Sequence, residues 1–98
     1  MSFTDDCYEL LCKVPCGKIT TYKAIADALN SKAYRAVGRA MNKNKNPIIV
    51  PCHRVVNSNG EVGQYAFGIE KKIILLEKEG VKIKNGRVEE FETLLHIF

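Results

Sequence analysis

Three short segments with helical apolar spacing occupy the first 42 residues, and this pattern limits the possible folds most strongly. The first segment repeats apolar residues at i, i+3, i+4 and i+7, which predicts one buried helix face: Cys7, Leu10, Leu11 and Val14. We expect Thr4 to cap this helix and Pro15–Cys16–Gly17 to end it. A second helix is expected over Lys23–Leu29, starting at Thr20 or Thr21. A third is expected over Lys32–Asn42, after a break at Asn30 and Ser31, with this apolar face: Ala33, Ala36, Val37, Ala40 and Met41.

The second and third helices form the pattern of a helix-turn-helix, or of a plain helical hairpin in a small bundle. No acidic residue occurs between Ala28 and Gly60, where six basic residues fall: Lys32, Arg35, Arg39, Lys43, Lys45 and Arg54. Such a block favours an anionic partner, nucleic acid above all, and a solvated basic face is the alternative. Gly38 in the middle of the third helix costs about 1 kcal/mol relative to alanine. We interpret it as a point of close approach by another helix or by a nucleic-acid backbone.

The rest of the chain alternates short apolar runs with turns. An apolar run over 48–50 leads into Pro51–Val56, and Asn59–Gly60 predicts a tight turn. A helix is expected over Ile69–Glu79, with Gly80 as its C-cap and three residues on its inner side: Ile69, Ile73 and Leu76. A last amphipathic helix is expected from Phe91, Leu94, Leu95 and Phe98. A length of 98 residues suggests one domain, and no apolar run approaches the ~20 residues of a membrane span.

The four cysteines divide into two kinds. Cys7, Cys12 and Cys16 are expected to be small buried or half-buried residues of a reduced, intracellular protein. With only two histidines in the chain, no familiar zinc-ligand spacing occurs, so we expect no metal site.

Cys52 differs because it adjoins His53 and Arg54, and a neighbouring imidazole or cation favours the reactive thiolate. A buried cysteine beside a hydrogen-bonded histidine is the alternative. In an extended segment the two side chains would point to opposite sides, so contact would need a water or a bend.

The segment Pro51–Cys52–His53–Arg54–Val55–Val56 resembles the active-site signature of the O6-alkylguanine-DNA alkyltransferases (methylated-DNA–protein-cysteine methyltransferases). The likeness runs from about Phe3 to Gly80 and includes these segments in order: Gly17–Tyr22, Arg35–Gly38, Asn44, Val62–Tyr65, Lys72 and Leu75–Gly80. It implies a mainly α fold with short β segments, a winged-helix-like single domain that contains a helix-turn-helix. We expect this domain to cover residues 1–98, with no separate N-terminal domain.

The resemblance also implies site roles. Cys52 would be the nucleophile, His53 would remove its proton through a water, and Glu79 would orient His53. Tyr22 would donate a hydrogen bond to guanine N3. Arg35 would fill the gap left by the flipped guanine, within this DNA-binding set: Arg35, Ala36, Gly38, Arg39, Lys43, Asn44 and Lys45. The substrate pocket would be lined by Val55, Tyr65 and Ala66.

The implied activity is DNA repair by direct, single-turnover transfer of an alkyl group from guanine O6 to Cys52. It needs no metal or organic cofactor. The partner would be double-stranded DNA containing O6-alkylguanine, bound through its minor groove by a monomer with no membrane partner. The location would be a reducing one, cytoplasmic in a prokaryote or nuclear in a eukaryote. Ala66, Phe67 and the bulky Tyr34 depart from the family pattern. Ala66 and Phe67 motivate one alternative, a module that binds the lesion without efficient transfer. A third interpretation is a small transcriptional regulator in which Cys52 is buried or senses oxidants.

Overall fold

A computed structural model describes residues 2–46 and 49–98. The elements follow in this order: α1 (Phe3–Leu11), β1 (Thr20–Thr21), α2 (Tyr22–Ala28), α3 (Tyr34–Asn42), the 3-10 helix η1 (Cys52–Arg54), β2 (Val55–Val56), α4 (Ile69–Lys78), β3 (Ile83–Lys84), β4 (Arg87–Val88) and α5 (Phe91–Leu94). The expected class, mainly helical with short strands, is confirmed. None of the helices in these two ranges is long and apolar enough to cross a membrane.

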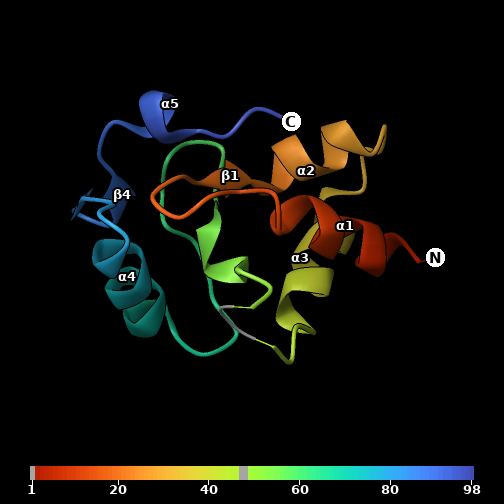
Figure 1. Cartoon of the computed structure of the whole chain (residues 1–98), viewed down its shortest axis with the longest axis horizontal. Helices are drawn as coiled ribbons and strands as arrows, with labels where there is room; N and C mark the ends of the chain where they lie inside the picture. The colour runs from red at the N-terminus through yellow and green to blue at the C-terminus, as the bar shows by residue number, and fades with distance from the viewer. Residues whose placement is uncertain (1, 47–48) are drawn as a thin grey trace.

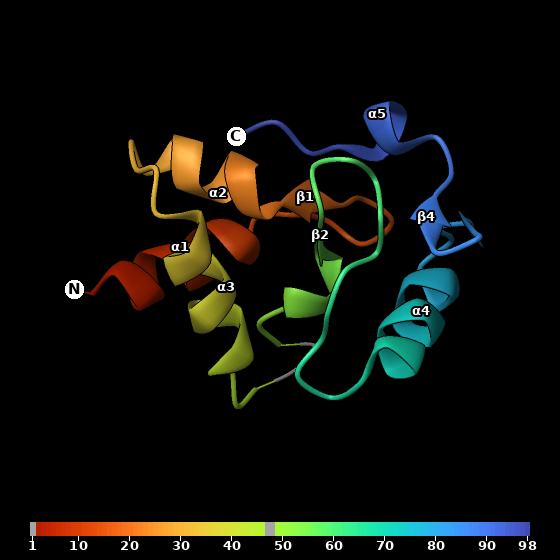
Figure 2. The ribbon, with the colours of Figure 1, turned by 180° about the vertical axis from the view of Figure 1, so that it is seen from behind.

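A short parallel strand pair divides the molecule into two parts. β1 pairs with β2 in the register Thr20↔Val55 and Thr21↔Val56. Figures 1 and 2 show α1, α2 and α3 on one side of this pair, and α4 with the β3–β4 hairpin on the other. Successive strand residues face opposite sides. Accordingly, Val55 packs into the core of α1–α3, whereas Val56 packs into a second core with Leu76 of α4.

The helix-turn-helix is confirmed, because α2 and α3 pack against each other around a short connection. Thr21 caps α2, and its side chain accepts a hydrogen bond from Ala24 N at 2.9 Å. Asn30 has φ 54°, a left-handed conformation that breaks the helix where the sequence predicted a break. Most inward residues are those expected from the apolar spacing: Ile25 and Ala26 of α2, and Val37, Ala40 and Met41 of α3. Ala33 was also expected on the apolar face, but it is exposed because it precedes the first residue of α3.

The boundaries of α1 differ from the prediction. Ser2, not Thr4, is the N-cap, because Ser2 and Asp5 exchange side-chain and backbone hydrogen bonds in a capping box. The helix ends at Leu11, earlier than the Pro15–Gly17 segment. Val14 lies beyond the helix but is still fully buried. The apolar spacing therefore predicted the burial of Val14 correctly but not the length of the helix.

Three expectations about exposure and about the C-terminus are wrong. Ile69 is 49% exposed at the first position of α4, outside the inner face. Cys12 and Cys16 are exposed, and only Cys7 is buried as expected. The last helix stops at Leu94, because the following chain pairs with Ile19: Ile19 N donates to Leu94 O at 3.0 Å and His96 N donates to Ile19 O at 2.7 Å. These bonds satisfy Leu94 O and His96 N with Ile19 as the partner, so the chain continues in an extended form instead of a further helical turn.

Candidate active site

Cys52 lies at the floor of the site, at the start of η1. Its side chain is 3% exposed and packs into the core formed by α1, α2 and α3. The segment is a 3-10 turn rather than the extended chain that the sequence suggested, and Cys52 N donates to Val50 O at 2.7 Å. This turn holds the thiol in a rigid, nearly dry environment directly behind the helix-turn-helix.

Asn44 connects the end of α3 to the cysteine. It is 4% exposed, and its Nδ2 donates both to Val50 O at 2.8 Å and to Cys52 Sγ at 3.2 Å. Its Oδ1 accepts a hydrogen bond from Asn46 N at 3.0 Å. The amide therefore fixes the turn that follows α3 and places a hydrogen-bond donor on the sulfur.

His53 points away from the α1–α3 core toward α4. The ring is fully buried, and its Nε2 lies 3.0 Å from Glu79 Oε2. Burial lowers the pKa of His53, and this effect outweighs the opposing effect of the Glu79 carboxylate. We assign the proton to Nε2 because Glu79 accepts there. Nδ1 makes no hydrogen bond to any residue that the structure describes, so it is left as the basic nitrogen.

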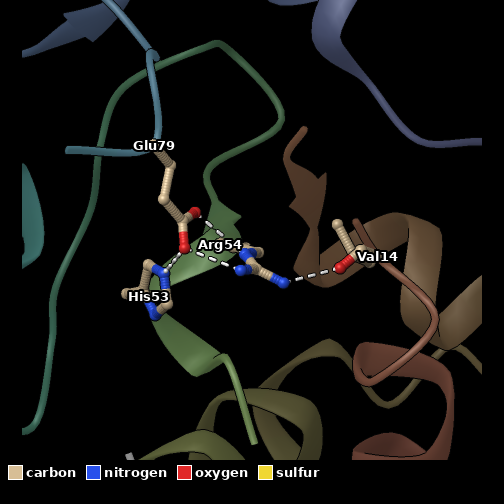
Figure 3. Close-up of polar contacts among 4 residues, drawn as sticks. All are labelled: Val14, His53, Arg54 and Glu79. Atoms are coloured by element: carbon tan, nitrogen blue, oxygen red, sulfur yellow. Dashed lines mark hydrogen bonds and ion pairs between the residues drawn. The ribbon is translucent and has the colours of Figure 1, made fainter. Parts of the chain in front are cut away.

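Glu79 binds two residues of η1 at once (Figure 3). Besides His53, it accepts hydrogen bonds from Arg54 Nε at 2.9 Å and from Arg54 Nη2 at 2.6 Å. Arg54 Nη1 in turn donates to Val14 O at 2.7 Å. Burial alone would raise the pKa of Glu79, but the hydrogen bonds from Arg54 and His53 prevail and lower it. Sequence reasoning predicted the pairing of Glu79 with His53 but missed Arg54, which connects α4 to the chain after α1.

Two tyrosines stand close to the sulfur. Burial raises the pKa of Tyr22, at the start of α2, and the nearby Cys52 raises it further. Burial and the contact with Cys52 raise the pKa of Tyr65 to about 12. Both phenols are therefore protonated at neutral pH and can donate hydrogen bonds. Tyr8 was not predicted; its hydroxyl donates to Ala40 O at 2.6 Å and fastens α1 to α3.

Lys72 is fully buried on the inner side of α4, an unusual position for a lysine. Its Nζ donates to Gln64 O at 2.9 Å and so holds the loop that carries Tyr65. Burial lowers the pKa of Lys72 to about 8, although the nearby Cys52 opposes the change. Sequence analysis singled out Lys72 only as part of the family likeness.

A hollow of about 420 Å³ lies between α3 and the loop that follows β2. It is lined by Tyr22, Tyr34, Arg35, Gly38, Asn42, Asn57, Gly63 and Gln64. A Cβ added to Gly38 would meet no atom within 4 Å among the described residues, so close helix packing does not explain this glycine. The approach of a nucleic-acid backbone to Gly38 stays a prediction.

The other predicted DNA-binding residues lie around this hollow or near it. Ala36 is half-buried in α3, and Arg39 is exposed in its last turn. A second hollow, of about 530 Å³, adjoins the first at Asn42 and is lined by Asn42, Lys43, Asn44, Lys45, Ala66 and Phe67. Val55 is fully buried after η1, in the same core as Cys52. The structure thus places the predicted residues around one thiol and one helix face.

The protein-family comparison bears directly on this arrangement. A family model described as "6-O-methylguanine DNA methyltransferase, DNA binding domain" matches residues 2–81. The chain belongs to this family. Among methylguanine methyltransferase relatives, a methylated-DNA–protein-cysteine methyltransferase of Methanosarcina mazei is 47% identical over 83 residues, which are 84% of this chain and 52% of the relative. The chain spans about half the length of the curated relatives it matches.

Two solved structures extend the comparison. The O6-methylguanine-DNA methyltransferase of Pyrococcus kodakaraensis is 50% identical with a TM-score of 0.76, and the match covers 83% of this chain and 47% of that one. S. pombe Atl1, solved in complex with damaged DNA containing O6-carboxymethylguanine, is 30% identical with a TM-score of 0.84. That match covers 96% of this chain and 94% of Atl1. The methyltransferase domain fold therefore also exists in a protein of about this length.

Proposed function

We propose that this protein repairs DNA by moving an alkyl group from guanine O6 to Cys52, once per molecule. The observation that carries the proposal is the environment of the sulfur, which is buried behind α3 with the Asn44 amide on it at 3.2 Å. Such a thiol is shielded from water. Its hydrogen-bond partner Asn44 lines one of the hollows on the α3 face. The names of the methyltransferase relatives support the same reaction.

The reaction would need three groups of this chain. The Cys52 proton passes through a bridging water to Nδ1 of His53, the nitrogen that Glu79 leaves free. The sulfur then attacks the alkyl carbon, so that the S–C bond forms while the C–O6 bond breaks. Tyr22 donates a hydrogen bond to guanine N3 and so stabilises the negative charge of the departing base. The base then regains the proton that His53 took from Cys52, through water. The thioether on Cys52 is stable, which makes the transfer irreversible.

The DNA would be bound by α3 through the minor groove, with the modified guanine flipped toward Cys52. Arg35 would fill the space that the base leaves, and Gly38 would let the DNA approach the helix surface. Lys43 and Lys45 would neutralise phosphates. The Atl1 structure, which contains damaged DNA, supports a duplex with a modified guanine as the partner.

Several broader expectations belong to the same proposal. The protein acts as a monomer and uses neither a metal nor an organic cofactor. It has no membrane partner and works where thiols stay reduced, because oxidation of Cys52 would block the transfer. Residues 1–98 behave as one alkyltransferase domain.

A second candidate function is recognition of the lesion without efficient transfer. The match to Atl1 over nearly the whole of both chains favours it. The side chains of Ala66 and Phe67 favour it too, because they line the hollow beside Asn44 where a polar group could otherwise meet the lesion.

The two candidates differ in what happens to the lesion. A duplex with one O6-methylguanine would be incubated with a twofold excess of protein, and the nucleosides would then be counted by mass spectrometry. Transfer predicts that O6-methylguanine disappears and guanine is restored, whereas Cys52→Ser restores none. Tight binding of the duplex with all O6-methylguanine left intact would support recognition alone.

A further inference from the structure

We propose that Tyr34 is a second stacking residue of the DNA interface, whose ring packs against the base step next to the flipped guanine. This inference rests on the proposed function and adds a contact that Arg35 alone does not provide. Its partner is a nucleobase within duplex DNA, recognised by its flat face rather than by its sequence.

Tyr34 stands at the meeting point of two hollows. It lines the 420 Å³ hollow together with Arg35 and Gly38. It also lines a hollow of about 410 Å³ on its other side, between α2 and the turn after β2, together with Tyr22, Lys23, Asn57, Ser58 and Asn59. The ring is 40% exposed, so it forms part of the wall between two concave surfaces on the face that α3 presents.

The backbone below this ring is fixed before any DNA arrives. Tyr34 N donates to Lys32 O at 2.9 Å, and Ala33 N donates to Ser31 Oγ at 3.0 Å. The helix that follows is anchored by Val37 and Ala40, which are buried against α1 and α2. An aromatic side chain on such a support loses little conformational freedom on binding, because only two side-chain torsions remain.

The neighbour of Tyr34 explains which part of the DNA it would meet. Arg35 is the next residue, and consecutive helix residues point about 100° apart. When the Arg35 side chain fills the space that the flipped guanine leaves in the duplex, the Tyr34 ring therefore faces the neighbouring base-pair step and not the same space. Minor-groove proteins commonly insert a bulky side chain at such a step, and an aromatic ring there stacks on whichever base it meets.

The polar groups around the second hollow agree with a nucleic-acid strand. Its lining contains the amide side chains of Asn57 and Asn59, the hydroxyl of Ser58, and Lys23, whose Nζ forms an ion pair with Asp27 Oδ2 at 2.8 Å. Amides and a hydroxyl beside an aromatic ring suit a sugar–phosphate backbone that passes next to a stacked base.

The test compares Tyr34→Ala with Tyr34→Phe, both in a Cys52→Ser background that prevents transfer. Binding to a duplex with one O6-methylguanine would be measured by fluorescence anisotropy over a range of salt concentrations. Ile74→Ala, a change at a 51% exposed residue of α4, serves as the matched control. Circular dichroism melts confirm that each variant is folded.

Stacking predicts that Tyr34→Ala binds about 5- to 150-fold more weakly, the equivalent of ~1–3 kcal/mol. Tyr34→Phe should stay within about twofold of the parent, and the salt slope should not change, because no phosphate contact is lost. The inference is overturned if Tyr34→Ala binds as tightly as the parent or more tightly, or if Tyr34→Phe loses as much as Tyr34→Ala. A parent protein that binds damaged and undamaged duplex equally would instead contradict the proposed function itself.

Discussion

Replacing Lys72 with methionine should stabilise the folded protein at pH 7 and slow the transfer. Lys72 is fully buried, and its ammonium has one hydrogen bond, to Gln64 O at 2.9 Å. No carboxylate within the described parts of the chain forms an ion pair with it. Such a charge is costly, which is why lysine is rarely buried without a partner.

The size of the effect follows from the pKa. Burial lowers the pKa of Lys72 to about 8, whereas a lysine in an unfolded chain has a pKa near 10.4. Keeping the amine charged in the fold at pH 7 therefore costs about 3 kcal/mol. Methionine removes this cost but leaves Gln64 O without its donor, which costs roughly 1–2 kcal/mol. We expect a net gain of about 1–2 kcal/mol in the free energy of unfolding.

The pH dependence separates this explanation from a simple packing effect. Between pH 8 and about 10.4 the unfolded chain binds more protons at Lys72 than the folded chain does, so the stability of the wild type rises with pH. The Lys72→Met variant lacks this gain. The difference in free energy of unfolding that favours Lys72→Met should therefore shrink above pH 8. It should reverse near pH 10, because the neutral amine of Lys72 still donates a hydrogen bond to Gln64 O and methionine does not.

Urea unfolding followed by circular dichroism at pH 7, 8, 9 and 10 would measure this difference. Lys71→Met is the matched control, because Lys71 is the exposed neighbour on α4. We also expect about tenfold slower transfer from Lys72→Met, since both the loop of Tyr65 and a cation near Cys52 are disturbed. A stability difference that does not vary with pH, or a Lys72→Met variant that is less stable than the wild type at pH 7, would contradict the explanation from the buried charge.

Four further substitutions test the rest of the site. Glu79→Gln should lose about 2–3 kcal/mol of stability at pH 7 in urea titrations. Because the folded-state pKa of Glu79 is lowered, this loss should shrink as the pH falls below about 4, and a constant loss would contradict the ion pair. Asn44→Ala should cost roughly 1–3 kcal/mol and slow single-turnover transfer, since Cys52 loses its amide donor; unchanged transfer would remove Asn44 from the reaction. Lys43→Gln and Lys45→Gln should each reduce the salt slope of DNA binding by roughly 1, and an unchanged slope would exclude a phosphate contact.

Much of the helix-turn-helix could be predicted from the sequence because its signals are local. Thr21 as the N-cap of α2, the left-handed Asn30 and the inward Val37 are each determined by residues within a few positions. The candidate active-site residues were accessible for a different reason. They belong to a short motif around Cys52 whose order along the chain matches a known family.

The remaining features depend on contacts between residues far apart in the chain, and the spacing of apolar residues does not predict such contacts. Arg54 meets Glu79 across 25 positions and Val14 across 40. The segment after Leu94 has helical apolar spacing, yet its backbone bonds to Ile19 keep it extended. In both places the local structure depends on a contact between residues that come together only when the chain folds.

The central claim is that the alkyl group ends on Cys52. The most direct measurement is a peptide mass map of the protein after reaction with excess duplex containing O6-methylguanine. We expect one added methyl group per molecule, located on Cys52, with no further addition at longer times. A methyl group on another cysteine, or none at all while the lesion is lost, would contradict it.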